Sequence, residues 1–87
     1  MNTERYTKKD AEQALVRFLS AINKPYGYDE GCYHLDYNAT YGGCLIHCVV
    51  NKGGGVSTPF GMHRMSPYDF CSCINFAIKA IELNKLA

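Results

Sequence analysis

The sequence predicts one α+β domain over residues 1–87, in which a helix, a three-stranded antiparallel meander and a second helix follow in α-β-β-β-α order. Apolar residues recur at helical spacing near both ends, and alternating polar and apolar segments with glycine-rich turns lie between them. Because an amphipathic helix and a one-sided sheet must each bury an apolar face, we expect both helices to pack on the same face of the sheet.

The first helix is predicted over residues 8 to 23. Thr7 and Asp10 resemble a capping box with Asp in place of Glu. Pro25 ends the helix, because its ring restricts the preceding residue and cannot continue the hydrogen-bond ladder. The apolar stripe of this helix consists of Ala11, Ala14, Leu15, Phe18, Leu19 and Ile22.

The second helix is predicted from about residue 67 to 84. Ser66 supplies an N-cap, Pro67 occupies the first helical position, and Asp69 lies in the first turn, where a negative charge is favourable. The stripe expected to face the sheet is Phe70, Cys73, Ile74, Ala77 and Ile81.

The central hairpin is predicted from residues 33–41 and 44–51, with Gly42 and Gly43 as a two-residue loop. A third, shorter strand is predicted from Val56 to Phe60 at the sheet edge, because Pro59 lacks a ladder donor. The 44–51 strand is then central. The expected pairs are Tyr41 with Cys44, Ala39 with Ile46, Tyr37 with Cys48 and Leu35 with Val50, and these residues, with Tyr33, should line the core.

The opposite face of this hairpin is predicted to stay exposed and to form a binding surface. Its residues are His34, Asp36, Leu45, His47 and Val49, to which we add the loop tyrosines Tyr26 and Tyr28. Exposed tyrosines are common in binding surfaces because they offer a large contact area at low entropic cost. The alternative for Leu45 and Val49 is a scattered pair of exposed aliphatic residues, which is normal for any protein surface.

Composition and charge argue against several classes of protein. A net charge of +1 gives no large positive field, so nucleic acid is disfavoured as a partner. The first ten residues contain no apolar signal core and no apolar run is long enough to span a membrane, so we expect a cytoplasmic protein with no membrane partner.

The cysteines and histidines do not follow a metal-binding pattern. The five cysteines include no Cys-x-x-Cys pair, and Cys71 and Cys73 point to nearly opposite sides of a helix. Cys44 and Cys48 should pack in the core as small apolar residues. Cys32, His34, Asp36 and His47 share the exposed face but lack the spacing of a nucleophile and its base. We therefore expect no metal, no cofactor and no enzymatic activity.

Several short motifs resemble small uncharacterised proteins of bacteriophages and mobile elements of gut bacteria. They are residues 31–37, Tyr41-Gly42-Gly43, residues 53–57 and Arg64-Met65-Ser66. The resemblance covers the last two thirds of the chain and implies a phage or mobile-element origin rather than a known activity. The α-β-β-β-α order is also similar to that of double-stranded-RNA-binding domains, although His63 and Arg64 replace the lysine cluster that those domains carry at the second helix.

We therefore expect a non-enzymatic interaction module, such as a phage-encoded modulator, that binds a host or phage protein or sequesters a small signalling ligand. A homodimer through the open sheet face is a further expectation. Two alternatives stay open: an RNA-binding domain that uses Lys52, His63 and Arg64, and a small metal- or thiol-dependent protein.

Overall fold

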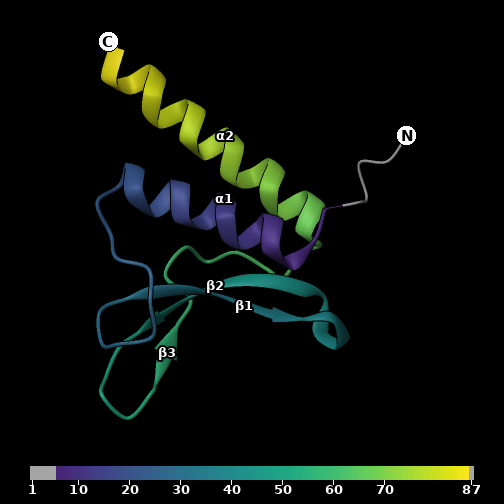
Figure 1. The fold of residues 1–87 in the computed structure, drawn as a ribbon, viewed down its shortest axis with the longest axis vertical. Coiled ribbons are helices and arrows are strands. Elements are labelled where there is room, and N and C mark those ends of the chain that lie inside the picture. Colours follow the sequence, from purple (N-terminus) through teal and green to yellow (C-terminus); the bar gives the residue numbers. More distant parts are fainter. Residues whose placement is uncertain (1–5, 87) are drawn as a thin grey trace.

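The computed structural model describes residues 6–86 and has the expected α-β-β-β-α order (Figure 1). The elements are α1 (Lys8–Ala21), β1 (Tyr33–Asn38), a short 3-10 helix η2 (Ala39–Tyr41), β2 (Gly43–Val49), β3 (Val56–Ser57) and α2 (Pro67–Leu86). The sheet is antiparallel with β2 in the centre, and both helices lie side by side on one of its faces. The predicted α+β fold is therefore confirmed.

Both helices begin at the predicted residues. The Asp10 N–H donates to Thr7 Oγ1 at 3.3 Å, and the Thr7 N–H donates to Asp10 Oδ2 at 2.8 Å, which completes the capping box. The Asp69 N–H donates to Ser66 Oγ at 3.1 Å and caps α2 in the same way. Within residues 6–86, neither helix is long and apolar enough to cross a bilayer.

The predicted loop of the hairpin is wrong. β1 ends at Asn38, because the Asn38 side chain accepts from the Thr40 N–H at 3.0 Å and starts the 3-10 turn. Gly42 ends that turn with φ 109°, while Gly43 is the first residue of β2 and pairs with Asn38. The β1 partner of each β2 residue therefore lies four positions closer to the N-terminus than predicted. The observed pairs are Cys44 with Tyr37, Ile46 with Leu35 and Cys48 with Tyr33.

This shift in register leaves the two faces of the hairpin as predicted. Side chains alternate between faces with a period of two, so a shift of four residues returns every side chain to its own side. Leu35, Cys44 and Ile46 accordingly belong to the core beneath the helices.

Four residues that were predicted to line the core are exposed instead, so these predictions are wrong. Ala39 and Tyr41 lie in the 3-10 turn beyond the end of β1, and Val50 follows the end of β2. Tyr37 lies near the end of β1 and is 39% exposed.

The third strand is shorter than predicted. Only Val56 and Ser57 pair with β2, and the chain then leaves the sheet at Thr58 and Pro59. The Phe60 ring packs edge-to-face on the Phe18 ring, with centroids 5.6 Å apart. Further along, Met65 returns to β2 and exchanges two backbone hydrogen bonds with Cys44. Residues 58–65 thus cross from the sheet edge to the start of α2.

The core lies between the two helices and the sheet. The α1 stripe is buried from Ala11 to Leu19 as predicted, and α2 contributes the buried side chains of Phe70, Cys71 and Ile74. Cys73, which was expected to face the core, is exposed instead. The core therefore meets α2 along a stripe that starts at Phe70 and Cys71.

The sheet face away from the helices is more covered than predicted. Leu45 and Val49 are only 8% and 5% exposed, so the expectation that both remain uncovered is wrong. At one end the Gly31 N–H donates to the Val49 carbonyl at 2.8 Å, which folds the preceding loop over the sheet. At the other end, the Arg64 side chain donates to the carbonyls of Asp36 in β1 and Gly43 in β2. Both ends of this sheet face are therefore partly covered.

Candidate functional site

The most exposed residue of the predicted binding surface is Tyr28, and it is held in place by the sheet. Its ring is 66% exposed and stacks on the His34 imidazole, with centroids 4.4 Å apart and 30° between the planes. The loop that carries Tyr28 follows the edge of β1: the Tyr33 N–H donates to the Pro25 carbonyl and the Gly27 N–H donates to the Tyr33 carbonyl, both at 2.9 Å. An exposed aromatic ring is therefore mounted on a hydrogen-bonded loop.

His34 connects this loop to the interior of the sheet face. The imidazole is buried, and its Nδ1 lies 3.3 Å from the Gly27 carbonyl oxygen, to which it donates when Nδ1 carries the proton. Its other neighbour is His47, the residue paired with it on β2, whose ring meets it edge-on at 5.7 Å. Tyr28, His34 and His47 thus form one continuous row of rings.

An ion pair closes the row at the far end. Arg64 Nη2 donates to Asp36 Oδ2 at 2.5 Å, and Arg64 Nη1 donates to the carbonyls of Asp36 at 3.3 Å and Gly43 at 3.0 Å. The guanidinium holds the pKa of the Asp36 carboxyl below its usual range. Asp36 is therefore a carboxylate that is already paired within the chain.

His47 is the residue of this row whose charge state is most constrained. Burial lowers the pKa of its imidazole below the usual 6.5, and the positive charge of Arg64 acts in the same direction. The Asp36 carboxylate opposes them only in part. His47 is accordingly neutral at pH 7 and can accept as well as donate a hydrogen bond.

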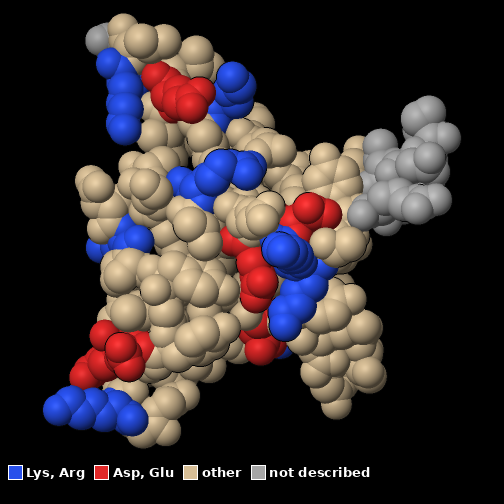
Figure 2. Space-filling view, in the orientation of Figure 1, with Lys and Arg blue, Asp and Glu red and all other residues tan. Residues whose placement is uncertain are grey.

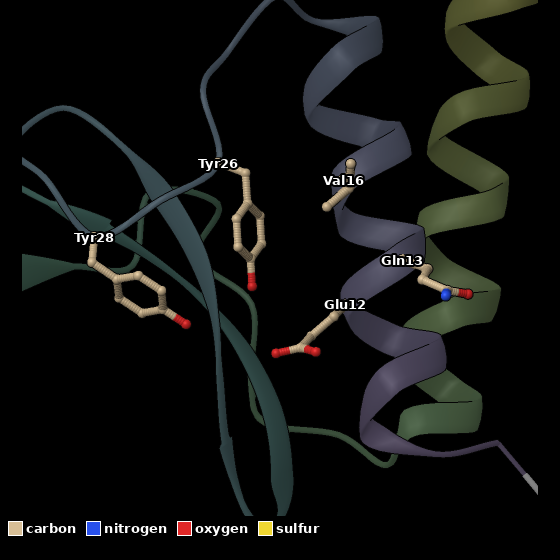
Figure 3. A pocket seen from close by; sticks show the side chains of 5 residues that line it. All are labelled: Glu12, Gln13, Val16, Tyr26 and Tyr28. Atoms are coloured by element: carbon tan, nitrogen blue, oxygen red, sulfur yellow. The ribbon is translucent and has the colours of Figure 1, made fainter.

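A cleft of about 420 Å³ opens between α1 and the tyrosine loop (Figure 3). In this view the Glu12 carboxylate and the Tyr26 hydroxyl point toward one another, and the Tyr28 ring points into the same space from the loop. The rings of Tyr26 and Tyr28 are nearly perpendicular, at 87°, with centroids 6.4 Å apart. Gln13 and Val16 complete the helical wall.

Tyr26 keeps its proton well above neutral pH. Burial raises the pKa of its hydroxyl to about 12, and the adjacent Tyr28 hydroxyl and the negative charge of Glu12 add to this effect. The cleft therefore presents neutral aromatic rings beside one carboxylate.

A second hollow of about 340 Å³ lies on the other side of Tyr28. Its charged residues are Asp29, Glu30 and Lys52, and Val49 lies at its base. Tyr28 lines both hollows, so the two share this one residue. Together the two hollows carry three carboxylates, counting Glu12, and one ammonium group.

Five of the seven residues predicted to bind are brought together in this row and cleft: Tyr26, Tyr28, His34, Asp36 and His47. Leu45 and Val49 are buried beneath or beside them. Sequence reasoning missed Glu12 and Val16. They lie one turn apart on the part of α1 that faces away from the core, where polar and isolated apolar residues carry no distinctive signal.

Some residues of the two alternatives are already engaged or buried within the chain. Arg64 donates to Asp36 and to two carbonyls, which occupies donors that an RNA phosphate would need. On the face drawn in Figure 2, the basic side chains of the described residues are scattered and do not form a broad basic area. Burial raises the pKa of the Cys44 thiol to about 11 and also raises that of Cys71, so neither is a ready thiolate.

Searches for relatives give no match to this chain among protein-family models, curated proteins or solved structures. The resemblance to bacteriophage proteins therefore stays a prediction. A function is inferred below from the chemistry of the cleft.

Proposed function

We propose that this chain is a non-enzymatic binding module that recognises a positively charged group in the cleft between Tyr26, Tyr28 and Glu12. The group belongs either to a partner protein, as a lysine or arginine side chain, or to a small signalling molecule. For a protein partner, we keep the expectation of a host or phage protein. The observation that carries the proposal is the pair of perpendicular tyrosine rings that face a carboxylate across an open cleft.

Aromatic rings attract cations because the face of the ring carries partial negative charge. Such a contact contributes about 0.5–1 kcal/mol at an exposed site and about 2 kcal/mol when water is excluded. Two rings at right angles can contact one cation from two directions. Tyr26 is half-buried and protonated, so its ring and hydroxyl are kept as a neutral wall of the cleft.

The charges around Tyr28 favour the same class of ligand. Glu12 lines the cleft, and Asp29 and Glu30 line the hollow on the other side of the ring, where Lys52 is the only basic residue of the lining. An anion such as a phosphate would therefore meet net negative charge at both openings. A cation gains from both the rings and the carboxylates.

The row behind Tyr28 supports a binding role rather than catalysis. His34 is buried and stacked, and Asp36 is paired with Arg64, so these groups hold Tyr28 and the sheet in position. Preorganised rings lose little conformational freedom when a ligand arrives. The function of the row is accordingly to keep an exposed ring in one place.

The proposal is tested by titrating the protein with tetramethylammonium chloride and following backbone amide signals by NMR. We expect shifts centred on Glu12, Tyr26 and Tyr28, with a dissociation constant on the order of 1–10 mM for so small a probe. Tyr28→Ala should weaken binding about fivefold, which corresponds to the loss of about 1 kcal/mol. Glu12→Gln should weaken it and reduce its dependence on salt.

Tyr41→Ala is the matched control, because Tyr41 is equally exposed but lies in the 3-10 turn at the end of β1, outside both hollows. It should bind the probe as the wild type does. An affinity that Tyr28→Ala leaves unchanged, or that Tyr41→Ala lowers equally, would overturn the proposal. A lysine-containing or arginine-containing peptide that binds more tightly than the free cation would favour a protein partner, and equal affinity would favour a small molecule.

A further inference from the structure

A third cavity opens at the surface between the helices and the sheet, separate from the tyrosine cleft and from the hollow beside Tyr28. It has a volume of about 210 Å³ and lies between β2, the two helices and the crossing segment 58–65. Only apolar side chains and one cysteine line it: Phe18, Ile46, Phe60, Met62, Met65, Cys73, Ile74 and Ala77. It shares no lining residue with the cleft or with the hollow beside Tyr28.

This cavity is open to solvent on one side, and its base reaches the core. Phe18, Ile46 and Ile74 form its base and are buried in the core. Phe60 is 45% exposed and Cys73 is exposed, so these two residues form the opening. A ligand seated between the base and the opening would remove apolar side chains from contact with water, which is favourable.

The lining defines the chemistry of the occupant. No charged side chain lines the cavity, so an ionised or strongly polar ligand would lose its hydration without gaining a charged partner. An apolar cavity of about 150 Å³ holds one benzene molecule, so a volume of about 210 Å³ is large enough for a single aromatic ring with a small substituent. Met62 and Met65 are flexible side chains that can adapt to the outline of such a ligand.

The segment over the cavity is attached in a way that permits entry. Between Thr58 and Met65, its backbone bonds are a turn from the Gly61 N–H to the Thr58 carbonyl at 3.2 Å and the pairing of Met65 with Cys44. The Phe60 ring rests on Phe18 at 5.6 Å and on Tyr33 at 6.3 Å. The ring can therefore move without breaking a strand, since β3 ends at Ser57.

We propose that this cavity is a binding site for a small apolar molecule of about one aromatic ring, which enters beside Phe60. The site is independent of the cation-binding cleft, and either proposal can fail without the other.

Benzene is the probe for this site, added to the full chain with methyl groups observed by NMR. We expect saturable shifts at Ile46 and Met65 and at Ala77. Ala77→Leu should fill the cavity and weaken binding at least tenfold. Ala80→Leu makes the same change on an exposed position of α2 outside the lining and should leave affinity within twofold of the wild type.

Cys73→Leu provides a second test that keeps the core intact, because Cys73 lies at the exposed rim. It should also weaken benzene binding, and the backbone spectrum should show that the variant is folded. The proposal is overturned if the wild type gives no saturable shift up to the solubility limit of benzene. It is equally overturned if folded Ala77→Leu and Cys73→Leu proteins both bind benzene as the wild type does.

Discussion

The Tyr28 ring stacks on the His34 imidazole at a centroid distance of 4.4 Å, so an exposed loop residue rests on a buried strand residue. His34 is in turn fixed by Gly27 on one side and by His47 on the other. The position of the proposed binding ring is therefore set by the sheet rather than by the loop alone. The following predictions test the parts of this arrangement separately.

Replacing His34 should weaken both stability and binding. His34→Ala removes a stacked ring and leaves a gap beneath Tyr28, so we expect a loss of about 1–2 kcal/mol in the free energy of unfolding. Chemical denaturation measures this change. His63→Ala removes an exposed histidine and should alter stability by less than about 0.5 kcal/mol. Equal effects of the two substitutions would show that the stack contributes nothing.

The pair of Asp36 and Arg64 should make stability depend on pH in the acid range. Arg64 lowers the pKa of Asp36 in the folded chain below the 3.8 of the unfolded chain. The contribution is therefore complete above the unfolded-chain pKa and is lost as the pH falls through the folded-state pKa. Asp36 is 37% exposed, so water screens the pair and its contribution at pH 7 should be about 1 kcal/mol or less.

Thermal unfolding of Asp36→Asn between pH 2 and pH 7 measures this contribution. The variant should lose less stability on acidification than the wild type. Asp29→Asn, on the exposed loop, should follow the wild-type curve. If Asp36→Asn has the same pH profile as the wild type, the ion pair does not contribute to stability.

His47 should contribute a second pH dependence at higher pH. Burial lowers the pKa of its imidazole below the 6.5 of the unfolded chain. Below that pH the unfolded chain binds more protons than the folded chain, so stability falls as the pH decreases from 6.5 toward the folded-state pKa. In His47→Gln this part of the decline should be absent. NMR titration of the His47 ring protons checks the direction, and a pKa above 6.5 would contradict it.

Substitution of Gly43 should lower stability more than substitution of Gly54. Its φ is 114°, and a Cβ there would overlap the Met65 carbonyl, which accepts the Cys44 N–H. Gly43→Ala should therefore cost about 3 kcal/mol or more, or prevent folding. Gly54→Ala has a similar backbone strain at φ 90° but meets no atom within 4 Å, so it should cost only about 1 kcal/mol. If both substitutions lower the free energy of unfolding equally, the close approach of Met65 to Gly43 is contradicted.

The sequence predicted the fold and the two faces of the hairpin because these depend on periodicity. The α1 stripe and the caps at Thr7 and Ser66 are local signals, and they are present as expected. The register was wrong because Gly42-Gly43 is a common hairpin loop, whereas the competing Asn38 side-chain turn takes the chain out of β1 earlier. The error moved Tyr41 out of the core but kept His34 and Asp36 on the predicted face.

The rest of the site depends on contacts between distant segments that no local pattern encodes. Arg64 reaches Asp36 from 28 positions away, and Glu12 meets Tyr26 only when α1 packs beside the loop. On α2, apolar residues occur on the outside as well as the inside: Phe76 is 77% exposed. Periodicity alone therefore could not decide between Cys71 and Cys73 as the core residue.

The most direct measurement of the central claim is a set of intermolecular nuclear Overhauser effects between tetramethylammonium methyl protons and the rings of the seven tyrosines. The account predicts effects to Tyr26 and Tyr28, and a weaker Tyr26 effect at the same probe concentration, below saturation, when Tyr28 is replaced by alanine. Effects confined to Tyr41 or Tyr68, or an even distribution over all exposed tyrosines, would contradict it.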